Sequence, residues 1–255
     1  MGGLRRRAAR AWLLVAIMLV PWVPARADEP ATAADLPVEQ IEKIVREYLL
    51  REPEIIYQAL GELQRRETEA AAARQRTAIV ENQSELLRDP ASPVGGNPDG
   101  DVTLIEFFDY RCAYCRRVDS SMRALLDEDR DLRVVFKELP VLGPDSVRAA
   151  RAALAARNQG GYVPFHFALM TADELSLEGI RDAAEAVGLD ADQLEADMAA
   201  PEVIAAIEAN YALANELGIE GTPAFVIGDE LVPGAVDKTR LTQLVEDART
   251  SCMTC

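Results

Sequence analysis

Two cysteines separated by two residues are the strongest chemical feature of the sequence. Cys112 and Cys115 lie in "RCAYCRRV", 111–118, and the chain has four cysteines in all. The preceding segment "DVTLIEFFDY", 101–110, is rich in β-branched and aromatic residues and predicts a buried strand. A helix is expected from about Ala113 to Asp127. Cys112 is therefore expected at a helix start, where unpaired backbone N–H groups and the helix dipole stabilise a thiolate.

This placement predicts a redox centre in which the first cysteine attacks and the second resolves. The thiolate is the attacking form in disulfide exchange. Cys115 follows Cys112 by one helical turn, so it can reach back and close a small disulfide ring. A purely structural disulfide is disfavoured, because so small a ring constrains little of the unfolded chain. A zinc site is disfavoured because no second pair of ligands is evident nearby.

An acidic residue inside the apolar run "LIEFF" is a candidate general base. A buried Glu106 would have a raised pKa and could accept the proton of Cys115; the alternative is a glutamate turned toward water. Lys137, in "VVFKEL", is the candidate partner of Glu106. His166 is the only histidine and, flanked by aromatic residues in "YVPFHFALM", is expected to serve packing.

Two further features could belong to a redox site. The segment "EGTPAF", 220–225, puts Thr222 and Pro223 at the entry to a predicted strand, where a proline without an N–H group is tolerated. Bonds before proline also include most of the cis peptides of folded proteins. Cys252 and Cys255 form a second C-x-x-C pair, for which a surface disulfide, a soft-metal clip and an electron relay all remain open.

The pattern along the chain predicts a mixed α/β domain preceded by helices. A second strand is expected at 132–139, a helical block at 144–217, a hairpin at 223–234 and a last helix at about 237–249. The loop "DPASPVGGNPDG", 89–100, separates this part from an upstream helical region. There an apolar stripe at helical spacing includes Ile41, Ile44, Val45, Tyr48 and Leu49, and it fades over 65–76.

The first 27 residues have the layout of a secretory signal peptide, with arginines, an apolar run and "ARA" at 25–27. They predict export, a mature chain from Asp28 and an oxidising compartment. The formal net charge of −16 disfavours nucleic acid and anionic lipid as partners. No other segment is apolar enough to span a membrane, so no membrane insertion of the mature chain is expected.

"FFDYRCAYCRRV" and "GTPAF" together resemble the DsbA family of thioredoxin-fold proteins, over about 101–249. The resemblance implies a thioredoxin fold, α/β, with a helical insertion at about 144–217. It also implies a cis Thr222–Pro223 bond beside the cysteines, where the backbone binds the substrate's chain. The expected domains are a signal peptide at 1–27, a helical oligomerisation stalk and linker at 28–92, and a DsbA-like thioredoxin domain at 93–255.

The segment "IEKIVREYLLREPEIIYQAL", 41–60, is similar to the N-terminal region of ScsC-type proteins. Those are DsbA-like periplasmic proteins of bacterial copper-tolerance systems, and some are trimers that act as disulfide isomerases. The resemblance thus implies a periplasmic homotrimer that acts on unfolded or misoxidised exported proteins and exchanges electrons with a membrane redox partner. Thr222 mildly favours an isomerase, and Ala113 and Tyr114, in place of the Pro–His of the family's oxidase, suggest a less oxidising centre.

The leading expectation is therefore a protein disulfide isomerase or reductase with a Cys-Ala-Tyr-Cys centre. One alternative is a monomeric DsbA-like dithiol oxidase. Another is a copper(I)-binding protein, with Cys112, Cys115, Cys252 and Cys255 as candidate soft ligands. Apart from copper(I), no cofactor is expected.

Overall fold

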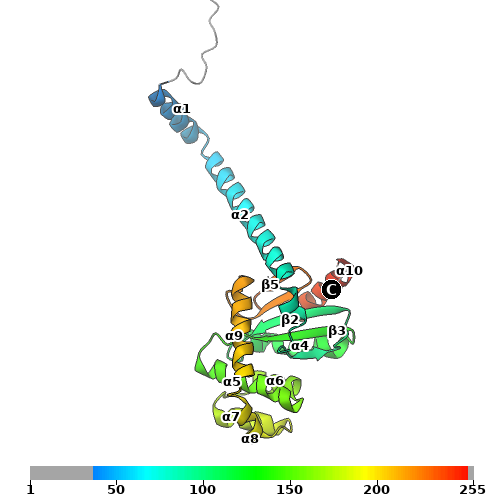
Figure 1. Ribbon diagram of the computed structural model, residues 1–255. Coiled ribbons are helices and arrows are strands. Elements are labelled where there is room, and N and C mark those ends of the chain that lie inside the picture. Colours follow the sequence, from blue (N-terminus) through cyan, green and yellow to red (C-terminus); the bar gives the residue numbers. More distant parts are fainter. Residues whose placement is uncertain (1–36, 252–255) are drawn as a thin grey trace, which may run out of the picture. The chain divides into compact units, whose positions relative to one another are not determined.

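The computed structural model describes residues 37–251 (Figure 1). The predicted signal peptide at 1–27 and the pair Cys252 and Cys255 lie outside the described residues. The chain divides by its internal contacts into one unit that ends at Gly61 and another that begins at Glu62. The elements are α1 (Val38–Arg51), α2 (Glu54–Glu81), α3 (Gln83–Leu87), β1 (Val94–Gly96), β2 (Val102–Phe108), α4 (Ala113–Glu128), β3 (Leu132–Glu138), α5 (Pro144–Ala155), the 3₁₀ helix η2 (Ala156–Gln159), α6 (Tyr162–Thr171), α7 (Leu177–Ala186), α8 (Ala191–Asp197), α9 (Pro201–Glu216), β4 (Ala224–Ile227), β5 (Glu230–Pro233) and α10 (Lys238–Ser251).

The second unit is built on a five-stranded mixed sheet in the order β1-β3-β2-β4-β5. Strands β2 and β3 are parallel, and the other neighbours are antiparallel. All of β2 is buried, because helices cover both faces of the sheet. Side chains alternate along a strand, so Leu104 and Phe108 pack in the layer of α4 and α10, whereas Ile105 and Phe107 pack in the layer of α3.

The end of α2 and the short α3 belong to this second unit. Ile79 and Leu86 are buried in the same cluster as Phe107 of the sheet. The division between the units therefore falls within α2, upstream of the domain boundary expected at 92/93. Part of the expected loop is also a strand, because Val94–Gly96 pairs with β3 as β1.

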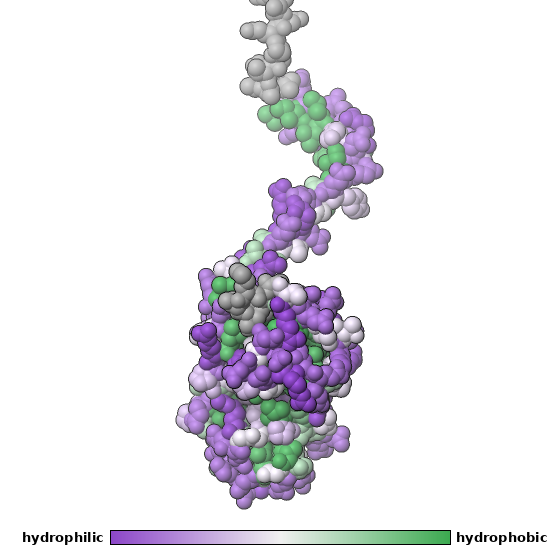
Figure 2. Space-filling view, turned by 90° about the vertical axis from the view of Figure 1, so that its right-hand side faces the viewer, coloured by the Kyte–Doolittle hydropathy of each residue, from purple (hydrophilic) through white to green (hydrophobic). Residues whose placement is uncertain are grey.

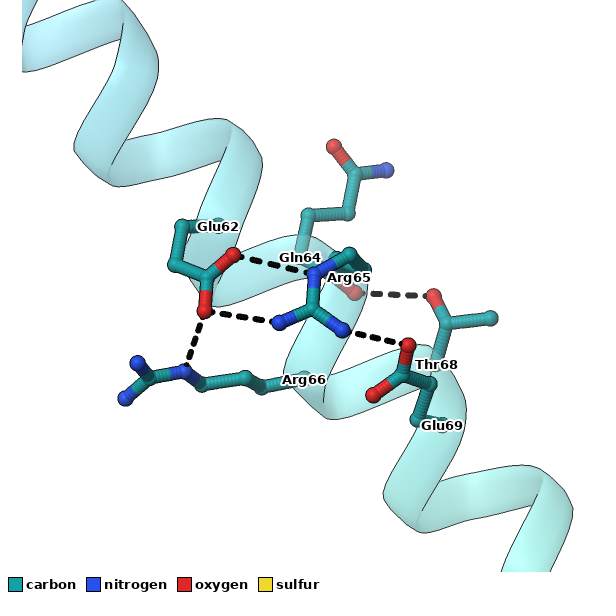
Figure 3. A network of polar contacts seen from close by, with 6 residues as sticks. All are labelled: Glu62, Gln64, Arg65, Arg66, Thr68 and Glu69. Atoms are coloured by element: carbon teal, nitrogen blue, oxygen red, sulfur yellow. Dashed lines mark hydrogen bonds and ion pairs between the residues drawn. The ribbon is translucent and has the colours of Figure 1, made fainter.

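Helix α2 continues where its apolar stripe fades. Over 62–69 its exposed side chains form an ion-pair network in which Arg65 bonds to both Glu62 and Glu69, and Arg66 bonds to Glu62 (Figure 3). The partners are three or four residues apart, which is the spacing that supports an isolated helix. Intrahelical pairing thus helps to maintain helical structure in a stretch that buries almost nothing.

The predicted helical block is present as α5 to α9, and Figure 1 shows α5 to α8 gathered beside the sheet. Its interruptions include turns at Gly160 and Gly188 and the start of α9 at Pro201. Gly160 and Gly188 have φ of 69° and 82°, a region that glycine enters without steric cost. Pro201 occupies the first turn of α9, where its missing N–H group is not needed.

Helix α1 contains no buried residue. Its apolar side chains Ile41, Ile44, Val45 and Tyr48 are all more than 40% exposed and follow helical spacing. Figure 2 shows hydrophobic surface on this helix. An exposed apolar face of this kind marks an interaction surface. Among the described residues, no helix is both long enough and apolar enough to cross a membrane.

Candidate active site

Cys112 is the N-cap residue of α4, as the sequence predicted. Its Sγ accepts a hydrogen bond from the backbone N–H of Cys115 at 3.3 Å and donates one to the carbonyl of Thr222 at 3.3 Å. Both thiols are free. Cys112 retains 5% of its surface, whereas Cys115 has none. The pair is thus asymmetric: both cysteines are buried, but Cys112 at the helix start retains a small exposed fraction and Cys115 retains none.

The second predicted motif lies beside the first, although 110 residues separate them in the chain. The Thr222–Pro223 peptide bond is cis, in agreement with the expectation from the resemblance. Strand β4 begins at the next residue and pairs with β2, which brings the Thr222 carbonyl to the Cys112 thiol. The Pro223 carbonyl accepts from the N–H of Gly234 at 2.8 Å, so its position is fixed by the hairpin.

An aspartate that the sequence analysis did not select fixes the loop before Cys112. The carboxylate of Asp109 accepts from the N–H of Arg111 at 2.7 Å, the N–H of Leu142 at 2.9 Å and the hydroxyl of Ser146 at 2.8 Å. Its carbonyl accepts from the N–H of Cys112 at 3.0 Å. The available signal was an aspartate just after a strand, a residue type that bonds the backbone two residues on.

The second cysteine needs a base before it can act. Burial raises the pKa of the Cys115 thiol, and its contact with Cys112 raises the pKa further. Glu106 is 2% exposed and lies on the sheet face that packs against α4. Burial, and secondarily the negative charge of Asp119, raise the pKa of Glu106 to about 8. A carboxyl group with that pKa can take a proton near neutral pH.

Asp119 is the second acidic group of this interior, and the sequence analysis missed it. It follows Cys115 by four residues on α4, so both lie on one face of the helix. Its Oδ2 accepts from Arg123 Nε at 3.0 Å, while its Oδ1 is buried without a partner. Burial raises the pKa of Asp119. The only sequence signal was that four-residue spacing.

Lys137 does not pair with Glu106, and that expectation is corrected. Parallel pairing of β2 and β3 sets Glu106 opposite Phe136, so Lys137, the next residue, points to the other face of the sheet. There its Nζ donates to the carbonyl of Glu85 at 2.7 Å and to Asp89 Oδ2 at 3.1 Å. Lys137 thus ties α3 and the segment after it to the sheet.

A buried polar network on the helical-insertion side also holds the cysteine loop. Glu138 Oε1 accepts from the hydroxyls of Tyr110 at 3.0 Å and Tyr162 at 2.8 Å. Tyr110 Oη also lies 3.0 Å from Nδ1 of His166. Burial raises the pKa of Glu138 and lowers that of His166 to about 3, so His166 is neutral at physiological pH. Its ring packs among Phe108 and other aromatics, which is the predicted packing role.

The fold and this site define a class. The chain matches the DSBA-like thioredoxin domain family over residues 103–246, more than half of its length, and it belongs to that family. Its fold is therefore the predicted thioredoxin fold, and its class is the DsbA-like thiol–disulfide oxidoreductases. Residues 38–70 match a second family, the copper resistance protein ScsC N-terminal domain, which covers α1 and the first part of α2.

Solved structures agree with this assignment. A thioredoxin-like oxidoreductase from Silicibacter pomeroyi DSS-3 is 50% identical, covers 67% of this chain and 99% of its own, and superposes with a TM-score of 0.65. The catalytic domain of Proteus mirabilis ScsC is 31% identical, covers 69% of this chain and 99% of its own, with a TM-score of 0.64.

Curated relatives of this chain include longer proteins that are named as Na(+)/H(+) antiporters. The Na(+)/H(+) antiporter NhaA of Herminiimonas arsenicoxydans is 33% identical over 172 residues, which is 64% of this chain and 27% of that protein. The chain thus spans about a quarter of the length of the curated relatives it matches.

Proposed function

We propose that this protein is an exported disulfide isomerase and reductase of the periplasm, with Cys112 as nucleophile and Cys115 as resolving thiol. The observation that supports it best is the asymmetry of the pair: Cys112 Sγ accepts a backbone N–H at the start of α4, and Cys115 is fully buried. A helix N-terminus favours an anionic sulfur, and an enclosed thiol is protected from direct reaction with clients.

The first step forms a mixed disulfide. The Cys112 thiolate attacks one sulfur of a client disulfide, a bond forms between Cys112 and the client, and the other client sulfur leaves as a thiolate. The Thr222 carbonyl, which accepts from Cys112 in the free protein, lies where the client backbone beside Pro223 would bind. In isomerisation a second client thiolate then attacks the mixed disulfide, restores Cys112 and leaves a rearranged disulfide in the client.

The reductase outcome uses the second cysteine. Glu106 removes the proton from Cys115, directly or through water, and the resulting thiolate attacks Cys112 Sγ. The bond between Cys112 and the client breaks, and the client sulfur leaves as a thiolate that is then protonated. Cys112 and Cys115 are now joined by a disulfide, so the client has gained two electrons from the cysteine pair. A membrane redox partner would then return two electrons to the pair. Unfolded and misoxidised exported proteins are the proposed clients.

Helix α1 supports the isomerase direction. Its exposed apolar stripe lies in the segment that matches the ScsC N-terminal domain. A helix of 14 residues that buries none of its side chains is marginal in water, so burial against copies of itself would supply the missing stability. Three active centres in one particle raise the effective concentration of thiolates around one client. We propose a homotrimer on this basis.

Two alternatives have specific tests. A monomeric dithiol oxidase would hold Cys112 and Cys115 mostly oxidised in the periplasm, and thiol trapping in cells distinguishes it from a mostly reduced isomerase. Copper(I) binding is favoured by the match to a copper resistance domain and by two soft sulfur donors in one place. Among residues 37–251 no cluster of three or more Cys, His, Asp or Glu is arranged for a metal, and the candidate soft ligands are still Cys112, Cys115, Cys252 and Cys255.

The experiment that tests the leading function is reactivation of a substrate with scrambled disulfides by the full mature chain. Cys112→Ser should abolish reactivation, because no thiolate remains to open the wrong disulfides. Cys115→Ser should retain part of it and accumulate mixed disulfide. Reactivation that survives Cys112→Ser would refute the nucleophile assignment. If Cys112→Ser also leaves copper(I) affinity intact while removal of 251–255 destroys it, the copper site lies in the tail.

A further inference from the structure

A polar groove is lined in part by the sequence neighbours of the nucleophile. It has a volume of about 680 Å³, and Arg111 and Ala113, the residues on either side of Cys112, are among its lining residues. That volume is typical of sites for small molecules. Because two lining residues flank Cys112 in the chain, a small disulfide bound at this end of the groove would lie next to the loop that carries the nucleophile.

One part of the lining is basic and held in place by neutral groups. Arg111 Nη1 donates to the carbonyl of Leu142 at 3.0 Å. Arg116 donates through Nε to the carbonyl of Tyr110 at 2.7 Å and through Nη1 to that of Ala172 at 2.8 Å. Carbonyl partners orient a guanidinium without cancelling its charge, and each group keeps further N–H donors. Both groups are thus prepared for a carboxylate.

Another part of the lining is acidic. Asp173 and Glu174, between α6 and α7, also line the groove. Within the part of the chain that the structure describes, no ion pair involves Asp173, Glu174, Arg111 or Arg116. The remaining charged pair of the lining, Arg148 and Asp145, is satisfied internally by an ion pair of 2.8 Å. The groove therefore presents two guanidinium groups and two carboxylates to a ligand.

The charges select a type of ligand. A ligand with an ammonium and a carboxylate group could bind both parts of the lining, whereas a purely cationic or anionic one would satisfy one part and meet repulsion from the other. The net charge of −16 also repels anions at long range, while a zwitterion approaches without that penalty. The reactive group beside the groove is a thiol, so the matching substrate contains a disulfide.

We propose that this groove binds small zwitterionic disulfides of the amino-acid type, of which cystine is the simplest, and that the cysteine pair reduces them. The Cys112 thiolate attacks one ligand sulfur and releases one thiol after protonation. Cys115 then attacks Cys112 Sγ and releases the second thiol. One dithiol and one small disulfide thus become a protein disulfide and two thiols. This inference rests on the exchange chemistry proposed above and adds a substrate class.

The test compares four small disulfides on the reduced full mature chain at pH 7. Cystine is zwitterionic, bis(2-hydroxyethyl) disulfide is neutral, cystamine is cationic and dithiodipropionate is anionic. The second-order rate constant of the protein with each disulfide is divided by the rate constant of dithiothreitol with the same disulfide. This ratio removes differences in the intrinsic reactivity of the four disulfides. We expect cystine to exceed the neutral disulfide by about tenfold after this correction, a preference that corresponds to ~1.4 kcal/mol.

Variants locate the preference. Arg111→Gln and the pair Asp173→Asn with Glu174→Gln should each reduce the ratio of the cystine rate to the neutral-disulfide rate, both measured on the same variant. Arg117→Gln is the matched control, because Arg117 stacks on Tyr114 and is not part of the groove lining. Equal corrected rates for all four disulfides, or a cystine preference that both groove variants leave unchanged, would overturn this inference alone. Failure to react with any disulfide would refute the proposed function as well.

Discussion

Helix α1 and the cysteine site place their chemistry in opposite environments. In α1 no residue is buried and apolar side chains face solvent, whereas in the interior behind the cysteine site two acidic groups, Glu106 and Asp119, are buried. Exposed apolar surface is stabilised when another apolar surface covers it. Burial of a carboxyl group raises its pKa, so the group holds its proton to higher pH. The first region is therefore suited to assembly, and the second to proton transfer.

The largest effect should follow from breaking the apolar stripe of α1. Ile44→Asp with Tyr48→Asp puts two charges into the proposed trimer contact, where a buried unpaired charge is very unfavourable. Light scattering on the full mature chain should then show a monomer in place of a trimer. Reactivation of scrambled substrates should fall severalfold, while oxidation of simple dithiols persists or rises.

Glu42→Gln, an exposed polar change on the same helix, is the control and should leave the trimer intact. A wild-type chain that is already monomeric at micromolar concentration would remove the main support of the isomerase proposal and favour the oxidase.

The next effect concerns Glu106 and the resolving step. Because the pKa of Glu106 is about 8, release of client from the mixed disulfide should accelerate as pH rises through that value. Glu106→Gln should remove this rise and slow release by roughly 100-fold above pH 8. Asp119→Asn, which removes a neighbouring negative charge, should move the midpoint to lower pH. Rapid-mixing kinetics of mixed-disulfide decay measure both, and an unchanged profile in Glu106→Gln would exclude the base role.

Stability should depend on pH through the same carboxyl group. The folded protein holds the Glu106 proton more tightly than the unfolded chain, whose pKa is near 4.5. The contribution of Glu106 to the free energy of unfolding is thus complete below about pH 4.5 and is lost as pH rises to about 8. In urea unfolding of the dithiol form, Glu106→Gln should flatten the decline over this window. An equally steep decline in the variant would assign the dependence to other groups.

The smallest effect on catalysis should come from Lys137, which the structure separates from Glu106. Lys137→Met removes the contacts with Glu85 and Asp89 and should cost about 1–3 kcal/mol of unfolding free energy. The pH profile of the resolving step should match wild type. A shifted profile at unchanged stability would restore Lys137 to the catalytic machinery.

The sequence was most informative where one local rule decides the outcome. Apolar, β-branched and helical patterns predicted β2, β3, the β4–β5 hairpin and the helical block, and the strand before Cys112 and the helix after it predicted the place of Cys112 at a helix start. Strand register is a tertiary property, so the pairing of Lys137 with Glu106 could not be judged from the chain. Glu138 was missed for the same reason: its partners Tyr110 and Tyr162 meet only after the helical insertion packs on the sheet.

The central claim is the division of labour between Cys112 and Cys115, and alkylation of the folded dithiol protein tests it most directly. After a brief exposure to iodoacetamide at pH 7, peptide mass spectrometry should find that, of Cys112 and Cys115, only Cys112 has an adduct, with Cys115 modified only after unfolding. Cys115 is enclosed and burial raises its pKa, so neither access nor charge favours its reaction. Modification of Cys115 as fast as Cys112 in the folded protein would contradict the account.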